Sequence, residues 1–181
     1  MDPQPNQHHY YNRKKDFSYV KEKLESKTSS WKSKSLSWMG WATLIKSVAM
    51  AIPNYSMAAF QLPKSFCEEM DSCVKRFWWA PKKDALHYYA PTAWKNICTS
   101  MQEGGLGFKT FWNLNQACLA KQAWWVLSKK DSICIQVLHG KYKVRSNWLN
   151  HKLGSVASWS WKSTENSKSI LSKGACILVG D

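Results

Sequence analysis

The acidic side chains are the first residues to test for chemistry, because polymerases and nucleases hold two divalent metal ions with clustered carboxylates. The chain has twelve Asp and Glu, scattered among lysine-rich segments, and no two aspartates are adjacent. No G-x-S-x-G, H-E-x-x-H or G-x-x-x-x-G-K-[ST] motif occurs. The glycine run at 103–108 lacks the spacing of a phosphate-binding loop and predicts a tight turn. We therefore expect no catalytic residues and no cofactor.

The cysteines give no sign of a metal centre or of a disulfide framework. They stand at positions 67, 73, 98, 118, 134 and 176, and no two of them form a C-x-x-C pair. Cys134 and His139 are a near-match to a pair of zinc ligands, but no second pair completes it. We expect reduced thiols, most of them in the core, and no metal site.

The charge balance is strongly basic and favours a polyanionic partner. Of 181 residues, 26 are Lys or Arg and 12 are Asp or Glu, which leaves a net charge of +14. Three of the cations are Arg, and Lys suits diffuse attraction to phosphates better than the reading of base edges. Any nucleic-acid contact is therefore expected to be independent of the base sequence.

The sequence has neither an apolar window of 18 residues nor a signal-peptide core, so we expect an intracellular protein without a membrane segment.

The apolar periodicity predicts a mainly α fold: a small helical bundle followed by a second, mostly helical region. Residues 1–12 lack periodicity and predict a disordered leader, and the break at Pro81–Asp84 separates a bundle at 13–80 from a region at 85–181. Helices are expected at about 16–28, Ser37–Ile52, Pro53 to about Gln61, from Pro63 onward, about Thr92–Cys98, Phe111–Leu127, and Asp131 or Ser132 to about Lys141. The tail predicts one more helix and a terminal strand.

The helix after Pro63 shows the clearest division into two faces. Its apolar stripe consists of Phe66, Met70, Cys73, Val74 and Phe77. The outer face is expected to carry Glu68, Glu69, Asp71, Lys75 and Arg76, whose charges nearly cancel. We therefore predict that this helix packs against its neighbours and does not bind nucleic acid.

The basic residues expected to contact nucleic acid lie near the N-terminus, in the second helix and around residue 143. They are Arg13, Lys14, Lys15, Lys21, Lys32, Lys34, Lys46, Lys141, Lys143 and Arg145. Eight basic and three acidic residues lie between Arg13 and Lys34, and Lys14 and Lys21 project from the polar side of an amphipathic helix. The alternative is a solvated helix face, with Lys21 and Glu25 paired at i,i+4.

The twelve tryptophans are expected mainly in the core. A different hypothesis is a protein-interaction module that uses Trp78, Trp79 and Trp112 as an exposed aromatic surface. A third is a decayed reading frame without a biochemical role.

Several phrases, in their order and spacing, carry a resemblance to a known family. They are RKKDFSYVKEKLESKTSSWKSKSLS, TLIKSVAMAIPNYSMAAFQLPKSF, FWW, EGGLGFKTFWNLNQACLAKQAW, SWSWKS and KGACILVGD. Over about residues 13–181 the chain resembles the reverse-transcriptase polyprotein of plant LINE-type non-LTR retrotransposons, just after the polymerase palm. The resemblance implies that residues 13–80 form a thumb, which grips the template–primer duplex, and that 85–181 form the connector before a zinc-binding segment. The palm with its paired aspartates would lie upstream, and the zinc ligands downstream.

Two departures from the family pattern remove a basic residue. The usual L-S-x-x-G-R reads LSWMGW, with Trp41 in the basic position, and the usual A-K-Q-x-W-R reads AKQAWW, with Trp125 there. The ending at Gly180 and Asp181 falls inside a longer family motif and suggests a truncated fragment. The resemblance thus implies a non-catalytic remnant that binds DNA or an RNA–DNA duplex weakly by backbone contacts. Its expected partner protein is a separate polymerase palm, and its expected location is the nucleus or the mitochondrion.

Overall fold

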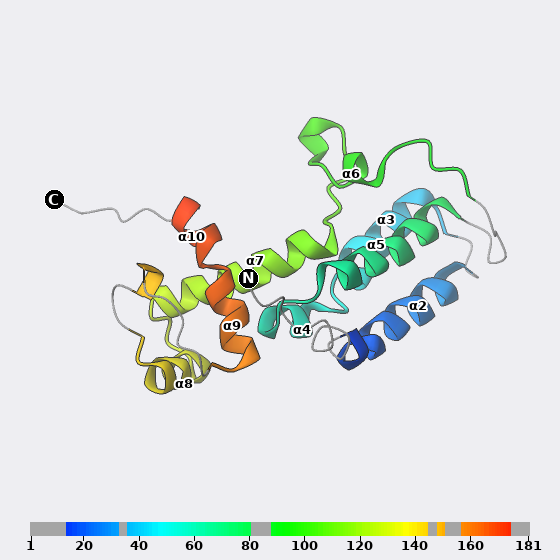
Figure 1. The fold of residues 1–181 in the computed structure, drawn as a ribbon. Helices are drawn as coiled ribbons and strands as arrows, with labels where there is room; N and C mark the ends of the chain where they lie inside the picture. Colours follow the sequence, from blue (N-terminus) through cyan, green and yellow to red (C-terminus); the bar gives the residue numbers. More distant parts are fainter. Residues whose placement is uncertain (1–13, 33–35, 81–87, 145–147, 151–156, 175–181) are drawn as a thin grey trace, which may run out of the picture. The chain divides into compact units, whose positions relative to one another are not determined.

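A computed structural model describes residues 14–32, 36–80, 88–144, 148–150 and 157–174. Every regular element in these residues is helical, which confirms the predicted mainly α fold. The α-helices, labelled in Figure 1 where there is room, are α2 (Ser18–Lys32), α3 (Trp38–Leu44), α4 (Asn54–Ala59), α5 (Lys64–Trp79), α6 (Trp94–Ile97), α7 (Phe111–Leu127), α8 (Ile133–Tyr142), α9 (Trp159–Asn166) and α10 (Lys168–Gly174). Short segments of other helix types lie at Ile45–Ala49 (π) and at Met101–Glu103 and Trp148–Asn150 (3₁₀).

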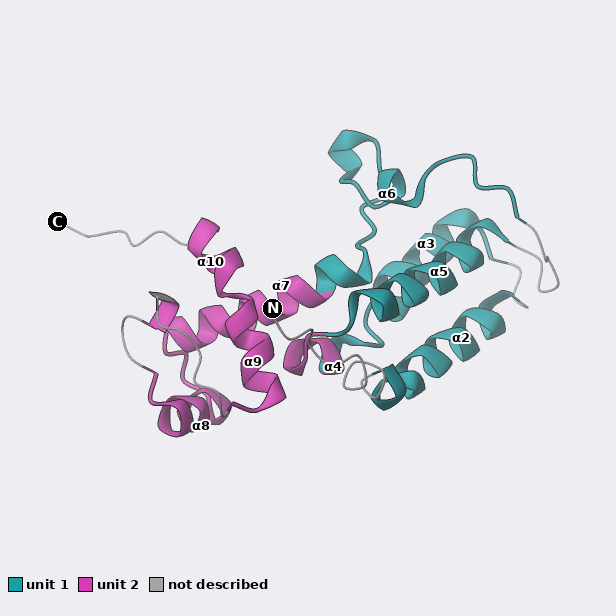
Figure 2. Cartoon of the chain, viewed as in Figure 1, with its two compact units in different colours: residues 1–55, 62–114 teal, residues 56–61, 115–181 magenta. Residues whose placement is uncertain are grey.

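The chain forms two compact units, shown in different colours in Figure 2. Unit 1 consists of residues 1–55 and 62–114, and unit 2 of residues 56–61 and 115–181. The predicted leader, the predicted break at Pro81–Asp84 and the predicted terminal strand all lie outside the described residues. The division into regions 13–80 and 85–181 therefore stays a prediction.

Unit 1 is built on α2, α3 and α5, whose apolar faces meet in an aromatic core. The ring centroid of Phe77 in α5 lies 5.7 Å from that of Trp31 in α2 and 5.4 Å from that of Trp41 in α3. All three rings are buried, and burying each contributes roughly 2–3 kcal/mol. The predicted stripe of α5 is confirmed as core, with Cys73 at its half-buried edge.

The second predicted helix begins where expected and changes type before its predicted end. Ser37 is the N-cap, and its hydroxyl oxygen accepts a hydrogen bond from the N–H of Gly40 at 3.2 Å. The α-helix ends at Leu44, and a π-helical turn follows in which the N–H of Met50 donates to the carbonyl of Ile45 at 3.0 Å. The Ser47 hydroxyl donates to the Thr43 carbonyl at 2.6 Å, and such bonds compete with the backbone ladder. The prediction of one regular helix to Ile52 was wrong, because the backbone changes to π-type hydrogen bonding at Ile45 and residues 50–53 form turns.

The glycine run forms the tight turn that its spacing predicts. Gly104 and Gly107 have φ values of +82° and +69°, which side-chain-bearing residues rarely adopt. A Cβ on Gly105 would lie 2.4 Å from the carbonyl oxygen of Thr99, so a larger residue does not fit there. The turn brings Phe108 into the core of unit 1, against Trp78 and Trp94.

In unit 2, α7 from Asn115 onward packs with α8, α9 and α10. The buried core of this unit consists of Ala123, Val126, Ile135, Trp148 and Trp161. Helix α7 has the predicted bounds, and its exposed positions 113, 117, 121 and 124 fall on one face. The tail forms two short helices, α9 and α10, where one was predicted. At the break between them, the buried Ser167 hydroxyl lies within hydrogen-bond distance of the carbonyls of Thr164 and Leu119.

Candidate nucleic-acid interface

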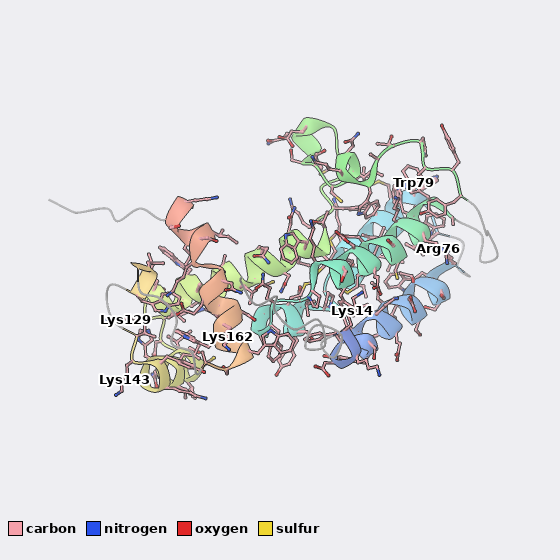
Figure 3. All side chains as sticks on the ribbon, viewed as in Figure 1. Lys14, Arg76, Trp79, Lys129, Lys143 and Lys162 are labelled. Atoms are coloured by element: carbon pink, nitrogen blue, oxygen red, sulfur yellow. The ribbon has the colours of Figure 1, made fainter. Side chains whose placement is uncertain are left out.

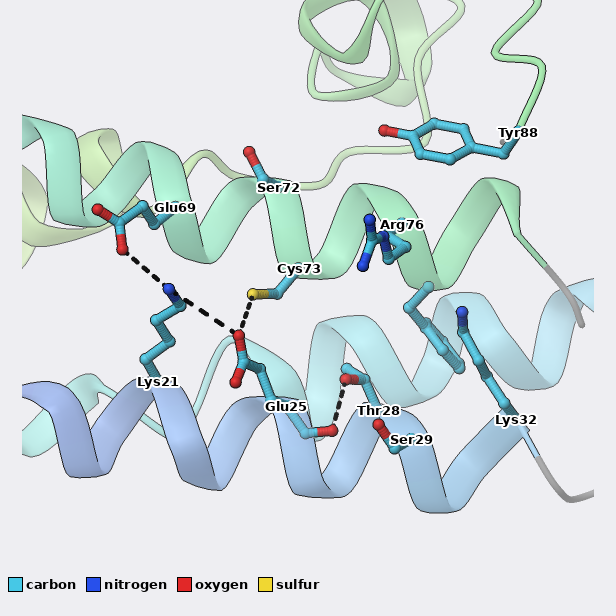
Figure 4. A pocket seen from close by; sticks show the side chains of 11 residues that line it. Lys21, Glu25, Thr28, Ser29, Lys32, Glu69, Ser72, Cys73, Arg76 and Tyr88 are labelled. Carbon is cyan, nitrogen blue, oxygen red and sulfur yellow. Dashed lines mark hydrogen bonds and ion pairs between the residues drawn. The ribbon is translucent and has the colours of Figure 1, made fainter. Parts of the chain in front are cut away.

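A polar groove of about 570 Å³ runs between α2 and α5 in unit 1 (Figure 4). The helix α2 contributes Lys21, Glu25, Thr28, Ser29 and Lys32, and α5 contributes Glu69, Ser72, Cys73, Arg76 and Phe77. These residues recur at intervals of three and four on both helices, so each helix turns one polar stripe toward the other. Tyr88 lies at the edge of the groove.

At one end of the groove, two lysines share one carboxylate. The Nζ atoms of Lys14 and Lys21 lie 2.8 Å and 2.9 Å from the two carboxylate oxygens of Glu69. These hydrogen bonds hold the pKa of Glu69 below its ordinary value, and the bond to Glu69 raises the pKa of Lys21. Glu25 lies 4.0 Å from Lys21 and accepts a hydrogen bond from the Cys73 thiol at 3.5 Å. Lys21 and Glu25 thus form the predicted i,i+4 pair, and Lys14 and Lys21 are half-compensated cations.

The other end of the groove carries positive charge without a carboxylate partner. Lys32 of α2 and Arg76 of α5 line it, and neither forms an ion pair with a described residue. Desolvation by burial, and then the positive charge of Arg76, lower the pKa of Lys32. Two like charges held together in this way favour an anion between them.

The structure places the other predicted cations at separate positions. Lys15 and Lys46 in unit 1 are exposed, and the Nζ of Lys46 lies 5.9 Å from the ring centroid of Phe108. Lys141 and Lys143 in unit 2 are exposed at the end of α8. Arg13, Lys34 and Arg145 lie outside the described residues.

Arg76 was missed as a candidate because the charges of α5 were expected to cancel on one outer face. Asp71 does not belong to that face: it is half-buried, and its carboxylate accepts a hydrogen bond from the N–H of Phe111 at 3.2 Å. The carboxylate of Glu69 is bound by Lys14 and Lys21. The prediction that Asp71 lies on the outer face of α5 was therefore wrong, and Arg76, labelled in Figure 3, keeps its charge unpaired among the described residues.

A second group of cations in unit 2 was also missed. The Nζ atoms of Lys121 and Lys130 lie 5.0 Å and 4.0 Å from the ring centroid of Trp125. Lys129, labelled in Figure 3, follows directly on α7 and is exposed. The spacing of Lys121 and Trp125, four residues apart on one helix, was the signal that could have identified this contact.

The three tryptophans named for an exposed aromatic surface differ in their burial. Trp78 is buried, at 7% exposure, and Trp79 and Trp112 are half-buried. The rings of Trp78 and Trp79 lie at an edge-to-face angle, with centroids 6.2 Å apart. Trp78 is therefore a core ring, whereas the interaction-module hypothesis stays a prediction for Trp79 and Trp112.

The cysteines of the described residues are free thiols. Burial raises the pKa of Cys67 to about 12 and the pKa values of Cys73 and Cys98 to about 11, so these thiols stay protonated. Cys67 is buried, Cys73, Cys98 and Cys118 are half-buried and Cys134 is exposed, so the expectation that most of the cysteines lie in the core was wrong for the described residues. In the described part of the chain, no three His, Cys, Asp or Glu side chains gather as metal ligands would, and no helix there has the length and apolar character to cross a bilayer.

Asp71 makes the stability of unit 1 depend on pH. Burial raises its pKa from about 3.8 to about 6, so between these pH values the native state binds more protons than the unfolded state, and stability falls as the pH rises. Asp71→Asn keeps an acceptor for Phe111 and removes the charge. We expect this variant to be more stable at pH 7 by up to about 3 kcal/mol. Urea unfolding of both proteins at pH 4, 5, 6 and 7 measures the difference, and an equal difference at every pH would contradict the assignment.

Two proteins of Arabidopsis thaliana are similar to this chain. The chain is 31% identical over 133 residues to the "Uncharacterized mitochondrial protein AtMg00310", a match that covers 73% of this chain and 86% of that protein. It is 30% identical over 177 residues to the "Putative ribonuclease H protein At1g65750", which covers 93% of this chain and 27% of that protein. The chain thus spans about a quarter of the length of this second relative. No protein-family model matches the chain, and no solved structure does.

Proposed function

The chain belongs to the family of the Arabidopsis mitochondrial protein AtMg00310, and from this premise we propose that it is a retroelement-derived protein that binds nucleic acid without acting on it chemically. The similarity to a protein named as a ribonuclease H, over 93% of this chain, supports a retroelement origin. So does the run of family phrases through residues 13–181. In this proposal α2, α3 and α5 correspond to a polymerase thumb, and the following helices to the connector of the LINE-type polyprotein.

The observation that carries the binding proposal is the uncompensated positive charge on unit 1. Lys15 and Lys46 are exposed, and Lys32 and Arg76 share a groove without a carboxylate partner among the described residues. Lysine-dominated charge contacts phosphates and carries little base information, so duplex DNA and RNA–DNA hybrid should bind through their backbones. A polymerase palm in a separate chain is the proposed protein partner, and the nucleus or the mitochondrion is the proposed location.

The salt dependence of binding tests this proposal. If about five cations neutralise phosphates, the logarithm of the binding constant should fall with the logarithm of salt concentration at a slope of roughly −4 to −5 on duplex DNA. Fluorescence anisotropy of labelled duplexes of several sequences, and of a hybrid, measures the slope and the sequence preference. A binding constant that does not change with salt, or no binding at about 50 mM salt, would contradict the proposed nucleic-acid binding. It would favour the alternative of a decayed reading frame without a biochemical role.

The absence of catalysis is proposed from the scattering of the twelve acidic residues along the sequence. The purified chain, given a primed template with deoxynucleotides or an RNA–DNA hybrid alone, and Mg²⁺ or Mn²⁺ in each case, should produce neither extension nor cleavage. Metal-dependent turnover that follows the protein through purification would overturn this part of the proposal.

A further inference from the structure

The α2–α5 groove divides its charges unequally along its length. Its acidic residues, Glu25 and Glu69, lie toward one end and are bound by Lys21 and Lys14. Toward the other end, Lys32 and Arg76 reach into the groove from opposite helices, as Figure 4 shows. An anion is therefore attracted to one end of the groove, and both helices contribute to its binding.

We propose that the Lys32–Arg76 end of this groove is a phosphate-binding site, which anchors one backbone phosphate of a bound nucleic-acid strand. This inference rests on the proposed nucleic-acid binding and names the point on unit 1 where the strand is held most tightly. It also separates two kinds of cation on the protein. Exposed lysines attract the strand diffusely, whereas this pair positions it.

The side chains at this end match the oxygens of a phosphate. The planar guanidinium of Arg76 can donate two parallel hydrogen bonds to two phosphate oxygens, and the Lys32 ammonium supplies a point charge and further donors. The hydroxyl groups of Ser29 and Tyr88 line the same groove and make no hydrogen bond to another described residue, so they are available as donors. The hydroxyl of Thr28 is already committed to the carbonyls of Leu24 and Glu25.

The two carboxylates that line the groove, Glu25 and Glu69, lie toward its other end and are paired with Lys21 and Lys14. Cys73 lines the groove, but its thiol is protonated at neutral pH. The groove volume of about 570 Å³ has room for a phosphate with its attached sugars. Tyr88, at the edge, offers an aromatic face next to the anion, where a sugar or an unpaired base can pack.

The test compares two double variants of the full chain that lose the same charge. Lys32→Gln with Arg76→Gln removes the site, whereas Lys23→Gln with Lys27→Gln removes two exposed cations of α2 that do not line the groove. We expect the first variant to bind a labelled 20-nucleotide strand or duplex about tenfold more weakly than the second, and to lower the salt slope by about 1 to 2. Equal weakening by both variants, with the native chain still binding, would overturn the phosphate site and leave the proposed function standing. No binding by the native chain would overturn both.

A second measurement uses the native chain and so does not depend on the folding of a variant. Lysines are acetylated with a limiting amount of acetic anhydride, with and without a saturating 20-nucleotide strand, and the extent at each residue is read by mass spectrometry. We expect strong protection of Lys32 by the strand and little protection of Lys23 and Lys27. An acidic polypeptide of equal charge serves as the competing anion: protection of Lys32 by this polypeptide, and not by the nucleic acid, would overturn the assignment.

Discussion

Phe77→Ala is expected to lower the free energy of unfolding of unit 1 by about 3–5 kcal/mol. The Phe77 ring is fully buried and contacts Trp31 and Trp41, so it joins α5 to both other helices of the bundle. Its removal leaves a cavity that two rigid indole rings cannot fill by small movements. Phe77 also lines the α2–α5 groove, so nucleic-acid binding should weaken together with stability.

Urea unfolding followed by far-ultraviolet circular dichroism measures this loss, with Tyr55→Ala as the matched control. Tyr55 is also an aromatic residue of unit 1 but is 89% exposed, and its truncation should change stability by less than about 0.5 kcal/mol. A loss below about 1 kcal/mol for Phe77→Ala would contradict the arrangement of α2, α3 and α5 around this ring.

Asn115→Ala is expected to destabilise unit 2 by about 2–4 kcal/mol. Asn115 is buried at 0% exposure, and its Nδ2 donates hydrogen bonds to the carbonyls of Met57 and Phe60, both at 2.9 Å. This side chain therefore connects residues 56–61 to the part of α7 that begins at Asn115, within unit 2. Truncation leaves two carbonyls without this donor, and an unpaired buried polar group costs about 1–3 kcal/mol.

The matched control for Asn115→Ala is Asn113→Ala, which removes an exposed amide from the same helix. The control should be neutral within about 0.5 kcal/mol. Asn115→Asp gives a sharper test, because a carboxylate cannot donate and would be repelled by the two carbonyls. We expect it to be less stable than Asn115→Ala at pH 7 and to recover as the pH falls and the acid becomes protonated. Stability independent of pH in Asn115→Asp would show that this position is not enclosed.

The positions of the main helices could be predicted from the sequence alone. The apolar run from Phe111 to Leu127, the Ser37 cap and the stripe from Phe66 to Phe77 each depend on residues within one helix. Such patterns repeat at the helical period, so a local window contains all the information they need. The change to a π-helical turn at Ile45 was not predicted, since the apolar residues of this segment follow the ordinary helical period.

The partners of individual charges could not be predicted in the same way. Spacing placed Glu69 and Asp71 on a polar face. In the fold, Glu69 binds Lys21 of α2 and Lys14, which precedes α2, and Asp71 accepts a hydrogen bond from the backbone N–H of Phe111. Trp41 shows the same limit of prediction from sequence. In the family pattern it stands in the place of a basic residue, whereas in the fold its ring is buried in the core next to Phe77. Contacts between residues more than thirty positions apart leave no periodic trace in the sequence.

By itself, the sequence determined that this protein is mainly helical, strongly basic and rich in lysine, because composition and helical period are properties of short segments. Only the tertiary structure decided which cations keep their charge unpaired. Lys14 and Lys21 share Glu69, whereas Lys32 and Arg76 meet across a groove. The physical reason is that an ion pair depends on a separation of a few ångströms between side chains of different helices, and only the packing of those helices sets that distance.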